Sequence, residues 1–112
     1  MKRTHTCGEL RGHHAGQQVQ LAGWVHNIRD FGGVLFVVLR DRYGRVQITF
    51  RPENKSLFDR ASTLRNQDVI GIVGTVVMRP PEARNPKMAT GDVEVIVEEM
   101  EIFSRSEVLP FL

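Results

Sequence analysis

The sequence lacks the features that define several classes of protein. Its 112 residues include one cysteine, Cys7, so no disulfide can form within the chain and a reducing compartment is the expected setting. No apolar run approaches the roughly 20 residues that a membrane-spanning helix needs, and the polar N-terminus does not read as an export signal. We therefore expect a cytoplasmic protein with no membrane partner.

Catalytic and metal-binding signatures are also absent. The chain has no glycine-rich phosphate loop, no nucleophile with a nearby base and no paired carboxylates, so we predict no catalytic residues and no cofactor within it. Structural zinc sites usually cluster cysteines at short spacings, and Cys7 with His5, His13 and His14 does not fit that pattern. We predict no metal site. The net charge of +2 permits a nucleic-acid partner without requiring one.

The most informative stretch, residues 22–51, predicts three strands joined by tight turns at Gly32-Gly33 and at residues 41–44. In its third strand the polar residues alternate with apolar ones, so they share one face, which we expect to be open to water: Arg45, Gln47, Thr49 and Arg51. If Leu39 pairs with Val46, Phe36 joins that face, opposite Thr49 and diagonal to Gln47. An aromatic ring, an amide and arginines on an exposed sheet can stack and read an unpaired base. The alternative is that Phe36 lies in the core of a strand buried on both faces.

The remaining elements suggest a barrel. The pattern predicts a short N-terminal helical turn, a first strand with a bend or bulge at Gly23, a helix over 56–65 capped by Ser56 and Asp59, and strands over 68–79 and 92–103. The last strand should turn Val93, Val95 and Val97 inward and Glu94, Ile96 and Glu98 outward, and three prolines should hold the loop before it extended. This order predicts an all-β, five-stranded OB-fold barrel of Greek-key type, with one helix between strands 3 and 4. We expect the domain to span residues 1–104, with residues 105–112 beginning a linker.

Two further features have plain structural interpretations. Trp24, beside a glycine in the first strand, is expected to pack against the sheet edge or a loop and not to stack a base. The acidic run of Glu98, Glu99 and Glu101 would repel phosphate, so it is expected on a solvated face away from nucleic acid.

Several motifs in this order resemble the N-terminal anticodon-binding domain of bacterial-type aspartyl-tRNA synthetases. The resemblance extends from Arg3 to Phe111. It rests on Thr6-Cys7-Gly8-Glu9-Leu10-Arg11, Gly23-Trp24-Val25, Arg29-Asp30, Leu39-Arg40-Asp41-Arg42, Gly44 with Val46-Gln47, Asn85-Pro86-Lys87-Met88-Ala89-Thr90-Gly91 with Val93-Glu94-Val95, and Leu109-Pro110-Phe111.

The resemblance implies a role for each matching residue. Phe36 would sandwich an anticodon base and Gln47 would read the middle uracil. Arg29 would contact a base or the neighbouring backbone. Glu94 would accept hydrogen bonds from guanine as the first anticodon base. Arg79 and Asn85 would contact the third base or its neighbours.

The chain also departs from the family. The run of arginines usual before the aspartate is here His26-Asn27-Ile28-Arg29, which implies fewer backbone contacts. Phe31 occupies a position linked to discrimination between aspartate and asparagine anticodons and matches neither expected residue, so acceptance of tRNA-Asn stays open beside tRNA-Asp.

By the same resemblance, the parent protein would be a class II aspartate–tRNA ligase. Its catalytic domain, absent here, would use ATP and Mg and form a homodimer. Two other functions are compatible with the fold: a sequence-tolerant single-strand binder, which should carry several stacking aromatics, and a protein-interaction OB-fold in which Phe36 is an anchor.

Overall fold

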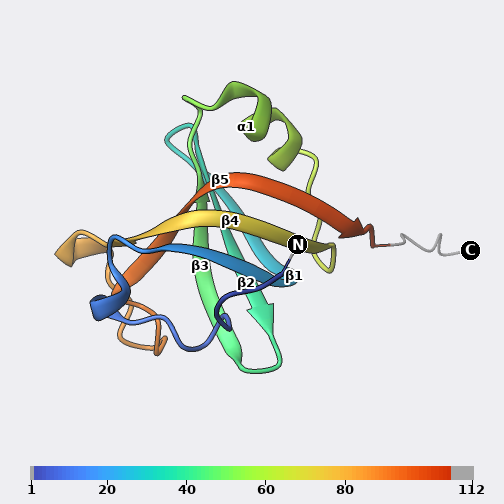
Figure 1. Ribbon diagram of the computed structural model, residues 1–112. Coiled ribbons are helices and arrows are strands. Elements are labelled where there is room, and N and C mark those ends of the chain that lie inside the picture. The colour runs from blue at the N-terminus through green and yellow to red at the C-terminus, as the bar shows by residue number, and fades with distance from the viewer. Residues whose placement is uncertain (1, 107–112) are drawn as a thin grey trace, which may run out of the picture.

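The computed structural model describes residues 2–106 and consists mainly of strands wrapped into a closed barrel (Figure 1). The neighbouring strands follow the order β1-β2-β3-β5-β4, with β3 and β5 parallel and the other pairs antiparallel. The predicted five-stranded barrel with one helix between β3 and β4 is confirmed. Its elements are η1 Gly12–His14, β1 Gln18–Phe31, β2 Val34–Asp41, β3 Gly44–Phe50, α1 Lys55–Ala61, β4 Val69–Met78, η2 Pro81–Ala83 and β5 Val93–Ser104.

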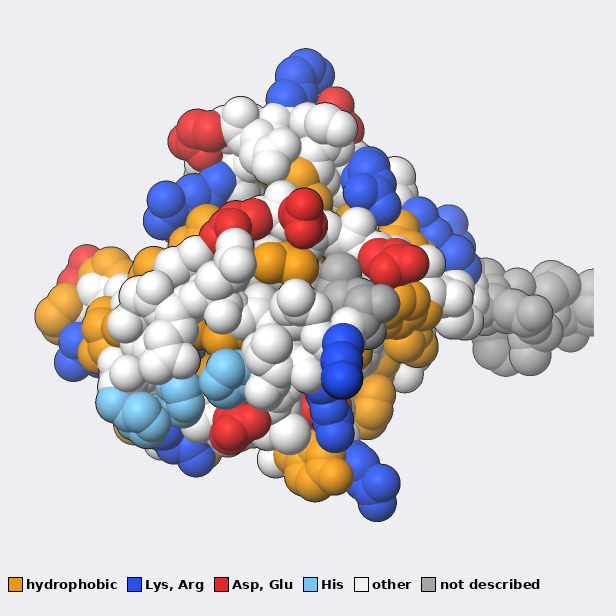
Figure 2. All heavy atoms as spheres, in the orientation of Figure 1, with side chains coloured by type: hydrophobic (Ala, Val, Ile, Leu, Met, Phe, Trp, Pro, Cys, Tyr) orange, Lys and Arg blue, Asp and Glu red, His pale blue; other side chains and the backbone are white. Residues whose placement is uncertain are grey.

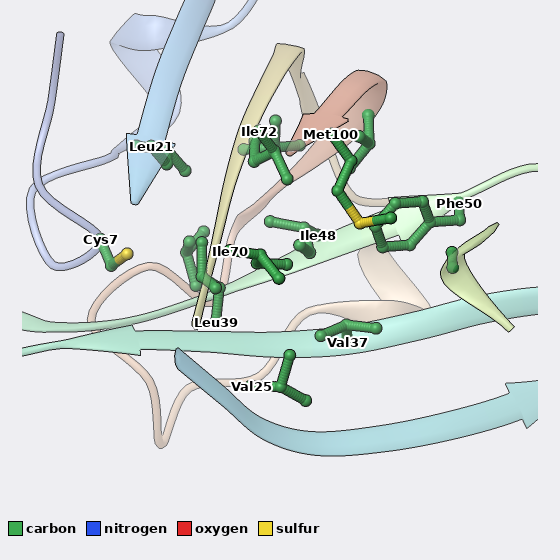
Figure 3. Close-up of a cluster of buried hydrophobic side chains, with 14 of the residues drawn as sticks. Cys7, Leu21, Val25, Val37, Leu39, Ile48, Phe50, Ile70, Ile72 and Met100 are labelled. Atoms are coloured by element: carbon green, nitrogen blue, oxygen red, sulfur yellow. The ribbon is translucent and has the colours of Figure 1, made fainter. Parts of the chain in front are cut away.

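The β2–β3 hairpin has the register that its alternation predicts. Leu39 pairs with Val46, and Phe36 pairs with Thr49. The inward residues of all five strands form one buried cluster, in which Val25, Val37, Leu39, Ile48, Phe50, Ile70 and Ile72 lie together (Figure 3). Each such side chain contributes about 1.5–3 kcal/mol of transfer free energy on burial, so this cluster fixes which face of each strand is outside.

The first strand bends at a different place from the one predicted. The register between β1 and β2 shifts between Val25 and Asn27, so the bulge lies beyond Gly23. Gly23 is required for another reason: a Cβ there would lie 2.4 Å from the carbonyl oxygen of Arg40, so only glycine lets β1 approach β2 this closely. At the end of β1, Gly32 and Gly33 have φ of 62° and 79° and form the predicted two-residue turn.

The helix is shorter than predicted and has a different cap. Helix α1 begins at Lys55, and its N-cap is Asn54, whose Oδ1 accepts a hydrogen bond from the Leu57 amide at 3.4 Å. The predicted capping box of Ser56 and Asp59 is therefore wrong, because both residues already lie within the helix. Leu57 and Ala61, four residues apart on one face, are buried against the barrel.

The proline loop before β5 also differs from the prediction. It contains the 3₁₀ turn η2 and is not uniformly extended, because Pro81 stands at the first helical position, where a missing N–H costs nothing. In β5 itself the predicted alternation is confirmed, since Val93, Val95 and Val97 are buried and their neighbours are more exposed.

Both ends of the described chain are fixed to the barrel. The amide of Cys7 donates to Asp41 Oδ2 at 2.8 Å, which holds the N-terminal segment against the β2–β3 turn. At the other end, the carboxylate of buried Asp68 accepts hydrogen bonds from the Ser106 amide at 2.7 Å and from Arg105 Nη1 at 3.2 Å. The predicted linker motif Leu109-Pro110-Phe111 lies outside the described residues.

Candidate nucleic-acid interface

The outer face of β1, β2 and β3 brings the predicted stacking residue together with an arginine. Phe36 points away from the core and is half-buried, so the alternative of a strand buried on both faces is wrong. Arg29 pairs with it across β1 and β2, and the Arg29 guanidinium lies over the ring, with Cζ 5.0 Å from the centroid. This is a cation–π contact at a site that water still reaches.

Gln47 lies one row along the same face. It pairs with Val38 and is diagonal to Phe36, and its side chain is half-buried. On the other side of β3, Ile48 pairs with Val95 of β5, so the preceding residues Gln47 and Glu94 share the outer face of adjacent strands. The ring, the amide and the carboxylate therefore lie on one continuous surface.

Thr49 is buried, although we expected every polar residue on this face of β3 to be open to water. It is 2% exposed, and its register places it between Phe36 on β2 and Ile96 on β5. Its Oγ1 is buried without a hydrogen-bond partner. The floor of the candidate interface therefore holds an unsatisfied hydroxyl, which costs free energy in the folded state.

Arg79 follows β4 directly and is buried, although arginine is rarely so. Its Nε donates to the Val93 carbonyl at 2.8 Å and its Nη1 to the Ala83 carbonyl at 3.3 Å, which orients the guanidinium, while Nη2 is buried without a partner. Burial lowers the pKa of Arg79; the nearby Glu94 carboxylate opposes this change and the Arg29 guanidinium adds to it. The register agrees with this, because Arg79 lies two residues beyond Val77, which pairs with Glu94.

The loop that carries Asn85 is closed by its own hydrogen bonds. The Asn85 amide donates to the Gly91 carbonyl at 3.0 Å, and Asn85 Oδ1 accepts from the Lys87 amide at 3.0 Å. Thr90 Oγ1 donates to the Arg45 carbonyl at 2.6 Å and so attaches the loop to the start of β3. The Asn85 side-chain oxygen thus accepts a hydrogen bond within the loop, and the side-chain NH2 group remains available to donate to a ligand.

Phe31 ends β1 beside the glycine turn and is 73% exposed, the most open of the large apolar side chains described. It pairs with Val34 and lies one row beyond Arg29 and Phe36 on the same face. The structure thus brings Arg29, Phe36, Gln47, Glu94 and Arg79 onto one side of adjacent strands, with Phe31 one row beyond them and Asn85 in the loop between η2 and β5. The sequence named Thr49 only as a polar residue of the outer face. Its pairing with Phe36 across β2 and β3 was the feature that could have predicted its position beneath the interface.

Other candidate sites receive no support. Within residues 2–106, no group of three or more His, Cys, Asp or Glu side chains is arranged to hold a metal ion, and no helix is long and apolar enough to cross a membrane. The acidic residues Glu98, Glu99 and Glu101 are exposed, and acidic side chains gather over β5 beneath α1 in Figure 2.

A barrel of this topology, with an aromatic ring, an amide and guanidinium groups on its outer β1–β3 face, defines an OB-fold of the nucleic-acid-binding class. Residues 19–103 match the family described as OB-fold nucleic acid binding domain (tRNA anti-codon), and the chain belongs to this family.

Curated relatives and solved structures agree with this assignment. The chain is 50% identical over 109 residues to the aspartate–tRNA(Asp/Asn) ligase of Gluconobacter oxydans, covering 97% of this chain and 18% of that protein. Asparaginyl-tRNA synthetase from Pyrococcus horikoshii, solved with asparaginyl-adenylate, superposes with a TM-score of 0.81 at 27% identity, over 98% of this chain and 24% of that one. OBody AM3L15, solved bound to hen egg-white lysozyme, superposes with a TM-score of 0.84 at 29% identity, over 98% of this chain and 96% of that one.

The comparisons confirm the predicted resemblance to the anticodon-binding OB domain of aspartyl-tRNA synthetases. The chain spans about a fifth of the length of the curated relatives it matches. The relatives are ligases, and the matched part is their OB domain.

Proposed function

We propose that this chain binds the anticodon loop of tRNA-Asp on the outer face of β1–β3, as the recognition domain of an aspartate–tRNA ligase. The observation that carries the proposal is the shared outward face of Phe36 and Gln47, with Arg29 over the ring and Arg79 two residues beyond Val77, the β4 partner of Glu94. The name of the Gluconobacter oxydans relative also includes tRNA-Asn, so the proposal extends to that tRNA as a second substrate.

Each group has a distinct task in this proposal. Phe36 stacks an unpaired base, and Gln47 offers both a donor and an acceptor to the Watson–Crick edge of the middle uracil. Glu94 accepts from the N1 and N2 donors of a first-position guanine. Arg79, whose guanidinium is oriented by the Val93 and Ala83 carbonyls, contacts the third base or its neighbours, and Asn85 contacts the same region. Phe31 stands at the margin as the candidate position for discrimination between the two tRNAs.

The proposal includes the rest of the protein to which this domain belongs. Its OB domain spans residues 1–104, and residues 105–112 begin the connection to a class II catalytic domain that uses ATP and Mg and forms a homodimer in the cytoplasm. This chain itself contributes affinity and specificity and performs no chemical step. It holds no cofactor or metal of its own.

Double-mutant analysis on both partners tests the base-reading role. We expect Gln47→Ala to weaken binding of an aspartate anticodon stem-loop by about 1–3 kcal/mol, and to have little further effect when the middle uracil is replaced by cytosine. Fluorescence anisotropy with labelled stem-loops measures both affinities. Equal binding of the intact domain to an unrelated anticodon loop would contradict the proposal and favour the sequence-tolerant binder.

A salt titration separates the RNA-binding role from the protein-interaction alternative. Binding through phosphates gives a logarithmic affinity that falls linearly with the logarithm of salt concentration. The short arginine run at residues 26–29 leaves few phosphate contacts, so the slope should be modest. An affinity that does not change with salt would support a protein-binding surface instead.

A further inference from the structure

A second row of side chains lies beside the proposed anticodon site on the same outer face. Trp24 of β1 pairs with Arg40 of β2, and Arg40 pairs with Arg45 of β3. All three precede or follow buried core residues, Val25, Leu39 and Val46, so they point outward. The sequence predicted a structural role for Trp24, and only the register shows that it shares a row with Arg40 on the next strand and Arg45 on the strand after it.

This arrangement has an electrostatic cost in the free protein. Arg40 and Arg45 stand directly opposite each other on neighbouring strands, and like charges in that position destabilise a sheet. Both arginines are exposed, and within residues 2–106 neither side chain takes part in an ion pair, a hydrogen bond or an aromatic contact. An anion bound between the two guanidinium groups would remove the repulsion and supply the missing acceptors.

Trp24 supplies the second half of a nucleotide-binding row. Its side chain is half-buried. Its strand partners are Arg40 on β2 and Val69 on β4, which is 37% exposed, so neither partner is acidic. A row of one aromatic ring and two unpaired cations on adjacent strands is a combination that binds single-stranded RNA, through stacking and phosphate contact together.

The spacing connects this row to the base-reading residues. Arg45 is two residues from Gln47 along β3, a rise of roughly 7 Å, which is about the length of two stacked nucleotides. An RNA strand whose middle anticodon base lies at Gln47 therefore reaches Arg40 and Arg45 within the same loop.

We propose that Trp24, Arg40 and Arg45 form a second RNA-binding row, which holds the phosphates of the loop nucleotides flanking the anticodon and stacks one of their bases. The row compensates for the short arginine run before Asp30 by supplying backbone contacts from β2 and β3. This inference rests on the proposed anticodon-binding function and extends the bound RNA by one to two nucleotides.

Charge-neutralising variants test the two arginines. Arg40→Gln and Arg45→Gln should each reduce the slope of log affinity against log salt by about 0.7, the value for one phosphate of a single strand. Lys55→Gln is the matched control, because Lys55 is an exposed cation on α1 and not on this face, and it should leave the slope unchanged. Thermal melting should show both arginine variants to be at least as stable as the wild type, since they relieve a like-charge pair.

The single tryptophan gives an independent signal. Trp24 is the only tryptophan in the chain, so its fluorescence should be quenched when an aspartate anticodon stem-loop binds, and the quenching should survive in Gln47→Ala at saturating RNA. Unchanged salt slopes in both arginine variants, or no change in Trp24 emission on saturation, would overturn the second row.

The two proposals fail in different ways. If Phe36→Ala weakens binding while both arginine variants behave like Lys55→Gln, the second row is wrong and the anticodon site stands. If the wild-type domain binds no anticodon stem-loop preferentially, the proposed function fails and the second row with it.

Discussion

The guanidinium of Arg29 covers the ring of Phe36, with its Cζ 5.0 Å from the ring centroid. The contact joins two strands, because the residues are direct partners across β1 and β2. It orders the ring before any ligand arrives and covers one face of it, so that a base stacking in the proposed site would use the other face. Pre-ordering of this kind reduces the conformational entropy lost on binding.

Replacing the ring should remove the stacking energy without changing base preference. We expect Phe36→Leu, which keeps an apolar side chain but no aromatic face, to weaken anticodon stem-loop binding by about 1–3 kcal/mol. The loss should be the same for loops with uracil or cytosine in the middle, because every base has a face to stack. Titration calorimetry with both loops measures it, and a loss confined to one base would contradict a pure stacking role.

Arg79 should support both the loop and the RNA. Arg79→Lys keeps the charge but cannot make the contacts from Nε and Nη1 to the Val93 and Ala83 carbonyls. Because hydrogen bonds to charged groups contribute about 1.5–3 kcal/mol, we expect a lower free energy of unfolding together with weaker RNA binding. Arg42→Lys, at the exposed tip of the β2–β3 turn, is the control. Urea denaturation and anisotropy measure the two effects, and unchanged stability would contradict the anchoring role.

The sequence predicted the strand order and the β2–β3 register because alternation, turn glycines and the buried set all agree there. It could not decide which way Phe36 faces, because Val34 and Val38 share its parity and are also apolar. Gly23 was assigned to a bulge because a close backbone approach and a bulge both select glycine, and a sequence does not distinguish them. Among the site residues, the burial of Arg79 depends on carbonyl partners that no side-chain pattern reveals.

Asp68 makes stability depend on pH at the acid end. Burial alone would raise the pKa of this carboxyl, but hydrogen bonds from the Ser106 and Arg65 amides and from Arg105 outweigh burial and lower the pKa below its ordinary value of 3.8. A group whose pKa is lower in the folded state stabilises the fold above the unfolded value and ceases to do so as pH falls through the folded value. The domain should therefore lose stability from about pH 4 downward.

Asp68→Asn tests this assignment. The variant should be less stable than the wild type at neutral pH, by about 2 kcal/mol, because an amide keeps only one of the two acceptor oxygens that serve the Ser106, Arg65 and Arg105 donors. It should also lose much of the acid dependence, since it cannot titrate. Thermal melts between pH 2 and pH 7 measure both, with Asp59→Asn as the control on an exposed helix carboxylate. An unaltered pH profile in Asp68→Asn would assign the acid dependence to another group.

Cys7 should react with thiol reagents only when the N-terminal segment detaches. The side chain is fully buried, and burial, followed by the nearby Asp41 carboxylate, raises the pKa of the thiol, so almost no thiolate exists at neutral pH. The segment fits tightly, since a Cβ on the next residue, Gly8, would lie 2.2 Å from the Tyr43 carbonyl oxygen.

Gly8→Ala should force that segment off the β2–β3 turn and accelerate Cys7 labelling by Ellman's reagent many-fold under native conditions. Gly16→Ala is the control for a glycine substitution outside this contact: Gly16 has a φ of 90°, so alanine is strained there, but no atom lies within 4 Å of a Cβ at this position. It should lower stability by about 1 kcal/mol without selectively exposing the thiol. Comparison of each labelling rate with the free energy of unfolding separates local detachment from global opening. Equal acceleration by both variants, in proportion to their lost stability, would mean that Cys7 is exposed only by global unfolding.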